Sequence, residues 1–118
     1  MLEDVEINPD VDNAVEIVGR LCKPPIYRKT PLGREITDVL IAVNRAYGKS
    51  DYIPCITWGR TAKFVGHLPV GTQIEMTGRF QSRPYTKKIS EDEIENRVAY
   101  EVSVGRVEII EEEENADE

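Results

Sequence analysis

The sequence is poor in the residues that build metal sites, disulfide frameworks and membrane spans. Its 118 residues include one histidine and two cysteines, and Cys22 and Cys55 lie far apart without a CxxC pair. The usual zinc spacings are therefore excluded, and we expect two reduced thiols rather than a redox pair. No run of 18 apolar residues occurs, and the acidic start is unlike a secretion signal. We expect a cytoplasmic chain with no metal, no other cofactor and no membrane partner.

Catalytic patterns are missing as well. The one histidine, His67, falls near the end of a predicted short helix, and no nucleophile elbow or glycine-rich phosphate loop occurs. The carboxylates gather toward the two ends of the chain, whereas general acid–base catalysis needs them paired in a pocket. We therefore expect no enzyme and no catalytic residue.

Charge is distributed unevenly along the chain. The formal net charge is -7, which at first argues against a nucleic-acid partner, because phosphates require a positive surface. However, residues 1–12 and 108–118 together hold 12 of the 22 acids and none of the 15 bases, so residues 13–107 carry +5. Residues 28–88, with 11 bases and four acids, carry +7. This basic middle fits nucleic-acid binding, although a solvated surface with a chance asymmetry fits the numbers equally well.

Alternation of apolar and polar residues predicts β structure along most of the chain. Five half-buried strands are expected, at residues 13–22, 35–45, 51–58, 72–85 and 97–110. The proline-rich segment 23–35 predicts a short edge strand closed by a Pro-Leu-Gly turn. Residues 60–68 predict a short helix with Thr61 as its N-cap and Ala62 and Val65 buried. The polar segment 86–96 predicts a mobile hairpin loop.

This order of elements predicts an all-β fold. Five strands with one short helix between the third and the fourth describe the OB-fold, a partly open Greek-key barrel that binds oligonucleotides or sugars on one face. Glycines inside the strands, at Gly19 and Gly78, would permit the bends of a small barrel. We expect one OB-fold domain at residues 13–110, between an acidic N-terminal extension at 1–12 and a disordered acidic tail at 111–118.

Aromatic residues are the strongest indication of function. An outward ring can stack on an unpaired base, which contributes about 1–3 kcal/mol per base. The candidates for stacking on the strands and turns are Tyr47, Tyr52, Trp58 and Tyr85. Each candidate lies near a positively charged residue; these residues are Arg45, Lys49, Arg60, Arg83 and Lys87. Any single tyrosine could instead be half-buried filler. By their phase or position we assign structural roles to Tyr27, Phe64, Phe80 and Tyr100.

Four blocks of the sequence resemble the bacterial single-stranded DNA-binding proteins. They are AVEIVGRLCKPP, TPLGREITDVLIAVNRAY, DYIPCITWGRTAKFVGHLPVGTQIEMTGRFQSRPY and VAYEVSVGRVEII, and together they cover about residues 13–110. The resemblance implies binding of single-stranded DNA without sequence preference, in replication, recombination or repair, by a homotetramer. It places DNA-stacking aromatics at Tyr47, Tyr52, Trp58 and Tyr85. It also implies phosphate contacts at Arg28, Arg45, Lys63, Arg79 and Arg83.

Three departures limit what the resemblance implies. Pro54 falls inside a strand and cannot donate a ladder hydrogen bond, so that strand must be bulged or at an edge there. Ile53 and Pro54 replace polar residues typical of that strand, which leaves a dimer open beside the tetramer. The end, EEEENADE, lacks the Pro-Phe tip through which relatives recruit replication and repair proteins; it could compete with DNA or simply aid solubility. A second hypothesis is an OB-fold subunit, similar to primosomal paralogues, that holds a protein partner.

Overall fold

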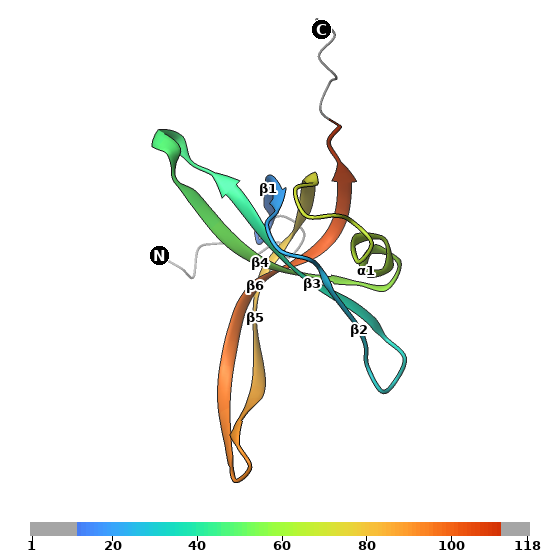
Figure 1. Cartoon of the computed structure of the whole chain (residues 1–118), viewed down its shortest axis with the longest axis vertical. Helices are drawn as coiled ribbons and strands as arrows, with labels where there is room; N and C mark the ends of the chain where they lie inside the picture. The colour runs from blue at the N-terminus through green and yellow to red at the C-terminus, as the bar shows by residue number, and fades with distance from the viewer. Residues whose placement is uncertain (1–11, 112–118) are drawn as a thin grey trace, which may run out of the picture.

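Strand pairing organises residues 12–111, which is the part of the chain that the computed structural model describes (Figure 1). The strands are β1 (Val15–Leu21), β2 (Ile26–Lys29), β3 (Glu35–Asn44), β4 (Ser50–Trp58), β5 (Gln73–Ser90) and β6 (Glu93–Ile109). The short helix α1 (Gly59–Val65) lies between β4 and β5, and a 3₁₀ turn, η2 (Ala46–Gly48), joins β3 to β4. Within residues 12–111, no helix is long and apolar enough to span a membrane.

Five of the strands close into a barrel. Their order is β1-β5-β6-β4-β3, and β1 pairs again with β3 through Leu21 and Ile41, which completes the circle. The ladder between β4 and β6 is parallel and short, joining Cys55 to Val102 and Ile56 to Ser103. Strand β2 is the predicted short edge strand and pairs with the first half of β3. The predicted all-β OB-fold, with its helix between the third and fourth barrel strands, is confirmed.

The core fills the barrel because alternate residues of each strand point inward. Leu21, Ile41, Ile74 and Met76 are almost completely buried there. Cys55 joins them as a free thiol, and burial raises its pKa to about 12. Both cysteines are unpaired, as expected, and such a thiol is a poor nucleophile.

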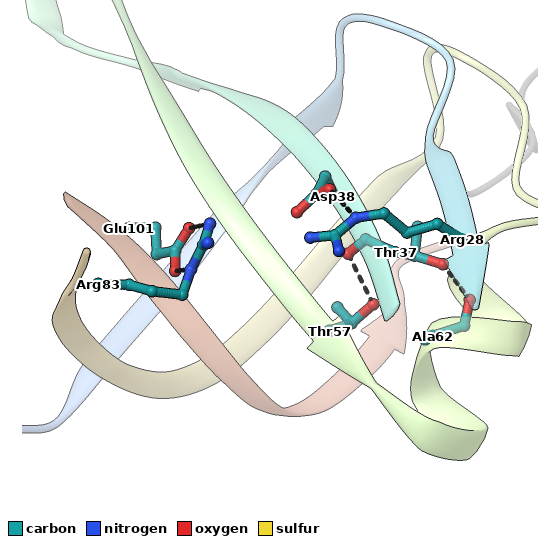
Figure 2. A network of polar contacts seen from close by, with 7 residues as sticks. All are labelled: Arg28, Thr37, Asp38, Thr57, Ala62, Arg83 and Glu101. Carbon is teal, nitrogen blue, oxygen red and sulfur yellow. Dashed lines mark hydrogen bonds and ion pairs between the residues drawn. The ribbon is translucent and has the colours of Figure 1, made fainter. Parts of the chain in front are cut away.

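Helix α1 covers one end of the barrel. Ala62 and Val65 are fully buried, as predicted. The hydroxyl of Thr37 donates a hydrogen bond to the carbonyl of Ala62 at 2.6 Å, and the hydroxyl of Thr57 donates to the carbonyl of Thr37 at 3.1 Å (Figure 2). These bonds satisfy polar groups that would otherwise be costly to bury, and they hold β3, β4 and α1 in one arrangement beneath the outer surface.

One strand glycine is required by a close approach of two backbones. A Cβ at Gly78 would lie 2.1 Å from the carbonyl oxygen of Ser103. The β5–β6 register shifts between Thr77 and Gly78, so Gly78 allows the bend at this bulge. Beyond it the two strands leave the barrel together.

The predicted N-cap of the helix is wrong. The helix begins at Gly59 with Trp58 as its N-cap, two residues before Thr61. Gly59 has a φ of +61°, a conformation that suits glycine and lets the chain turn directly from β4 into the helix.

The predicted loop at residues 86–96 is also wrong. Strands β5 and β6 stay paired from Phe80 opposite Val102 to Ser90 opposite Glu93, and residues 91–92 make the turn. This hairpin, residues 80–102, is called the arm. Its base still belongs to the barrel, because Val102 pairs with Cys55, and its outer part projects well beyond the barrel (Figure 1). Both sides of its outer part are exposed, so the segment needs no apolar alternation to form strands.

Three aromatics assigned to the core or to the inward face are exposed instead. Phe80 is 51% exposed, Tyr100 61% and Phe64 46%. Phe80 and Tyr100 do have the phase of the core residues, but they lie at the point where β5 and β6 leave the barrel, beside the last barrel pair of Cys55 with Val102. Their rings are nearly parallel, with centroids 6.5 Å apart.

Pro54 occupies an edge position, one of the two alternatives expected for it. The β3–β4 register runs through Leu40 opposite Pro54 without a shift. On its other side, β4 pairs with β6 only at Cys55 and Ile56. Pro54 therefore lies where, within residues 12–111, that side of β4 has no strand partner.

Candidate nucleic-acid interface

The strand register brings the candidate residues of β2 to β6 onto one surface. The side of these strands that points away from the core is called the outer face. One row of paired residues crosses it from strand to strand, in the order Ile26, Asp38, Ile56, Ser103 and Arg79. A second row joins Arg28, Ile36 and Trp58. Thus Arg28, Trp58 and Arg79, three of the predicted site residues, share this face.

Trp58 is held in place by two neighbours. Its indole Nε1 donates a hydrogen bond to the hydroxyl of Ser103 at 3.1 Å. The guanidinium carbon of Arg34 lies 4.5 Å from the ring centroid, a cation–π distance. One face of the half-buried ring is therefore occupied by Arg34, so a stacking partner would meet the remaining surface or would have to displace this cation. Sequence reasoning missed Arg34, because its contact with Trp58 depends on the register that pairs Ile36 with Trp58.

Tyr52 is the most accessible aromatic within the outer face. It lies on β4 opposite Ala42 and is 61% exposed. A small cross-strand neighbour leaves the side of a ring open to a partner. Tyr52 and Trp58 are six residues apart on the same side of β4, as their even spacing predicts.

Tyr47 and Arg45 lie at the tip of the β3–β4 hairpin, at the edge of the outer face. Tyr47 is 98% exposed and has a φ of +66°, a conformation that is uncommon for a non-glycine residue. Arg45 Nε lies 3.1 Å from a carboxylate oxygen of Asp51. In Figure 1 this tip and helix α1, which carries Lys63, lie on opposite sides of the barrel. The structure therefore does not bring Tyr47 and Lys63 together.

Tyr85 lies on the arm, opposite Arg97 of β6. The guanidinium of Arg83 stands 5.9 Å from its ring centroid. The two side chains point to the same side of β5 because they are two residues apart. Arg83 therefore positions the ring electrostatically where the arm leaves the barrel.

Arg83 itself is fixed by a carboxylate that the sequence reasoning missed. Its Nε and an Nη donate to the two carboxylate oxygens of Glu101 at 2.8 and 3.1 Å (Figure 2). Glu101 is almost fully buried, and Gln81 donates a further hydrogen bond to it at 2.8 Å. The hydrogen bond from Arg83 holds the pKa of Glu101 below its usual value, and the pKa of Arg83 is raised in turn. Such a bidentate pair is strong and directional.

A second ion pair lies next to this one. Arg28 Nε lies 3.1 Å from a carboxylate oxygen of Asp38, and both side chains are about two-fifths exposed. The charge of Asp38 contributes to the raised pKa of Arg83, and that of Arg28 to the lowered pKa of Glu101. Figure 2 shows the two pairs side by side across the sheet. The four charges cancel, so the centre of the outer face has no net charge.

The predicted cations therefore fall into two groups. Arg28, Arg45 and Arg83 each have a carboxylate partner. Lys63 and Arg79 are exposed and have no ion pair with any of residues 12–111. Of the two unpaired cations, Arg79 lies on β5 at the end of the first row and Lys63 lies on helix α1.

Comparison with known proteins identifies the family. Residues 12–110 match the model of the single-strand binding protein family. The chain belongs to this family. It is 39% identical over 80 residues to single-stranded DNA-binding protein A of Bacillus subtilis, a match that covers 62% of this chain and 46% of that protein. Single-stranded DNA-binding protein 1 of Staphylococcus aureus is also 39% identical, with 62% and 48% covered. The chain thus spans about half the length of these curated relatives.

The fold is shared with a solved structure of the same kind. A deletion mutant of the single-stranded DNA binding protein from Thermus aquaticus superposes with a TM-score of 0.73 at 23% sequence identity. The match covers 90% of this chain and 44% of that one. It supports the OB-fold assignment independently of the family match.

Proposed function

We propose that this chain binds single-stranded DNA without reading a defined sequence and without catalysing a reaction. The observation that carries the proposal is an outer face on which the exposed ring of Tyr52 and the half-buried ring of Trp58 lie among cations, in a chain of the single-strand binding protein family. Bases stack on such rings, and cations follow the phosphates. The proposed roles are in DNA replication, recombination and repair, at residues 13–110.

Each candidate residue has a proposed role. Tyr47, Tyr52, Trp58 and Tyr85 stack on bases. Lys63 and Arg79 attract phosphates directly because they have no ion pair within residues 12–111. The three paired arginines contact DNA only when a phosphate or a nucleobase competes with the carboxylate that each one binds. These pairs are Arg28 with Asp38, Arg45 with Asp51, and Arg83 with Glu101. This exchange weakens their contribution to affinity, because the displaced carboxylate stays close to the bound DNA.

Replacing Tyr52 tests the proposal. Tyr52→Ala should weaken binding of oligo-dT by about 1–3 kcal/mol, the contribution of one stacked base. Tyr52→Phe keeps the ring and should bind like the wild type. Trp58 is the only tryptophan, so its fluorescence on titration with oligo-dT reports binding in all three proteins. The affinity should also fall with salt, with a log–log slope of about −0.7 per phosphate contact.

The opposite result has a definite meaning. If Tyr52→Ala binds as tightly as the wild type and salt has no effect, stacking on the outer face is wrong. The chain would then fit better as an OB-fold subunit that holds a protein partner in a primosome or a mobile-element replication complex.

We also propose that the chain is a homo-oligomer, a tetramer or a dimer, in which a second copy covers the apolar side of the arm. Phe80, Tyr100 and Val98 are each at least half exposed on that side. It continues into an apolar groove of about 310 Å³ whose walls include Ile17, Ile53 and Phe80. Clustered exposed apolar surface of this kind marks interaction sites.

The acidic segments proposed at 1–12 and 111–118 lie almost entirely outside the described residues.

A further inference from the structure

A hollow opens beside the bulge of β5 and β6, where the first row of the outer face ends. Its volume is about 350 Å³, and its lining includes Asn13, Gly78, Arg79, Ser103 and Gly105. Arg79 and Ser103 lie opposite each other on the two strands. This cavity is called the bulge hollow.

The lining of the bulge hollow includes a cation and no carboxylate. Arg79 is exposed and has no ion pair with any of residues 12–111. The next acid on the same side of β6 is Glu101, and both of its oxygens are bound by Arg83. On β1, Glu16 lines a different groove. The charge of Arg79 is therefore available to an anion in the hollow.

Two neutral side chains add unused hydrogen-bond donors. The hydroxyl of Ser103 accepts a hydrogen bond from Trp58 Nε1 at 3.1 Å, but its own O–H donates to no other group in residues 12–111. The side-chain amide of Asn13 exchanges two hydrogen bonds of 2.8 Å with the backbone of Phe80. This exchange uses one of its two N–H groups, and the second has no partner in the same part of the chain.

Gly105 keeps the hollow open although the fold does not require a glycine there. A Cβ at Gly105 would lie 3.8 Å from the carbonyl oxygen of Thr77, which is an ordinary contact. Its φ lies outside the left-handed region that favours glycine. A glycine inside a strand weakens the strand and often marks a place where a ligand approaches closely. The space above Gly105 therefore fits a bound group better than a packing need.

These donors match a phosphate group. Arginine, serine and asparagine side chains are among those that contact phosphate oxygens in complexes with nucleic acids. The hydroxyl of Ser103 touches the edge of Trp58, so a nucleotide whose base stacks on this ring has its sugar and phosphate close to the hollow. A phosphate contact carries no sequence information, in agreement with binding that does not read a sequence.

We propose that the bulge hollow binds one phosphodiester group of the DNA strand. Arg79 supplies the charge, and Ser103 and Asn13 donate hydrogen bonds to the phosphate oxygens. The hydroxyl of Ser103 then links the ring of Trp58 to this phosphate. The inference rests on the proposed DNA binding and adds to it the place where one phosphate is seated.

Filling the hollow with an uncharged side chain tests the proposal. Gly105→Leu changes no charge, so it should alter the salt dependence of DNA binding only by excluding a phosphate. The affinity for labelled oligo-dT is measured by fluorescence anisotropy at several salt concentrations. The log–log slope should become shallower than that of the wild type by about 0.7, the contribution of one phosphate contact. The affinity should fall at least about threefold, and the melting temperature should not decrease.

Thr77→Leu is the matched control. Thr77 is exposed, lies beside Gly105 and lines a different groove. The variant therefore adds the same uncharged side chain next to the hollow and not inside it. It should keep the slope and the affinity of the wild type.

Double variants show whether Arg79 and Gly105 act on the same phosphate. Arg79→Gln should also make the slope shallower by about 0.7. Combined with Gly105→Leu it should lose no more than either single variant, because both changes remove one contact. Lys63→Gln combined with Gly105→Leu should lose about twice as much, because Lys63 lies apart on helix α1.

A free phosphate ion presents the same oxygens as a phosphodiester. The titrations are therefore repeated with inorganic phosphate in place of chloride at equal ionic strength. A phosphodiester held together with its stacked base should tolerate this exchange, and the affinities should not change. A loss of affinity in the wild type that is absent in Gly105→Leu would assign the hollow to free phosphate and overturn the proposal.

The remaining outcomes separate this inference from the proposed function. A wild-type slope in Gly105→Leu would overturn the phosphate site while DNA binding stands. Equal losses in Gly105→Leu and Thr77→Leu would overturn it too, and so would additive losses in the double variant of Arg79 and Gly105. A wild-type chain that does not bind oligo-dT would refute the proposed function itself.

Discussion

Arg83 illustrates, at the scale of single residues, what the sequence can and cannot predict. Alternation along β5 correctly places Arg83 and Tyr85 on one side of the strand. The partner of Arg83, however, is Glu101, which lies on another strand and comes into reach because Gln81 pairs with Glu101. Arg34 was missed for the same reason, since its contact with Trp58 depends on how β3 and β4 pair. The side of a strand on which a residue lies follows from its own strand, but a contact between side chains on different strands requires the register.

The Arg83–Glu101 pair should make stability depend on pH. Glu101→Gln removes the carboxylate that compensates Arg83, so the free energy of unfolding at pH 7 should fall by about 1–3 kcal/mol. The folded-state pKa of Glu101 is lowered, so the pair stabilises the fold fully above the unfolded value of about 4.3. That stabilisation is lost as the pH falls from this value through the folded pKa. Urea unfolding at pH 7 and at about pH 3 should show the difference from wild type shrinking in acid.

Glu108→Gln is the matched control on the same strand. Glu108 pairs with Arg106 at 3.2 Å, but both side chains are mostly exposed. Exposed pairs contribute little, so this variant should differ from wild type by less than about 1 kcal/mol. Two results would contradict the account. The Glu101→Gln protein could be as stable as the wild type at pH 7, or its free energy of unfolding could be lower than that of the wild type by the same amount at both pH values.

The arm shows the limit of sequence patterns at the scale of elements. Apolar alternation predicts the barrel strands because one side of each is buried. Residues 86–96 have solvent on both sides, so their pairing leaves no such pattern, and the predicted mobile hairpin loop is instead a pair of strands with a two-residue turn at 91–92. The inward phase of Phe80 and Tyr100 was predicted correctly, but the point where the strands leave the barrel depends on the bulge at Gly78. Side and exposure are therefore separate properties of a strand residue.

Tyr100→Ser should dissociate the proposed oligomer. Tyr100 is 61% exposed on the apolar side of the arm, so the change removes contact surface without opening the core. Sedimentation equilibrium without DNA should give the wild type a mass of two or four times the 13.4 kDa chain. The variant should approach one chain mass.

Ile26→Ser provides the comparison, because Ile26 is equally exposed but lies on the outer face. It should sediment like the wild type. A monomeric wild type, or a Tyr100→Ser protein that stays oligomeric, would show that the apolar side of the arm does not bind a second copy.

The whole molecule combines a closed barrel with an uneven distribution of charge. The order of strands and helix was enough to predict the OB-fold, because few folds accommodate five strands and one plug-sized helix in about 100 residues. The parallel contact of β4 with β6 that closes the barrel was beyond the sequence pattern, since it joins segments more than 40 residues apart. Closure is what brings Trp58 to Ser103 and places β4 beside β6 on the outer face. The strands in the basic middle of the chain thus form one surface, and Tyr52 and Trp58 lie on it.

Photo-crosslinking tests most directly whether DNA lies on this surface. Oligo-dT containing 5-bromodeoxyuridine is irradiated on the full chain, and the attached residues are located by mass spectrometry. Stacking on the outer face predicts crosslinks at Tyr52 and Trp58, with Tyr85 where the strand reaches the arm. Crosslinks confined to Phe80 and Tyr100, on the other side of the arm, would contradict the central claim.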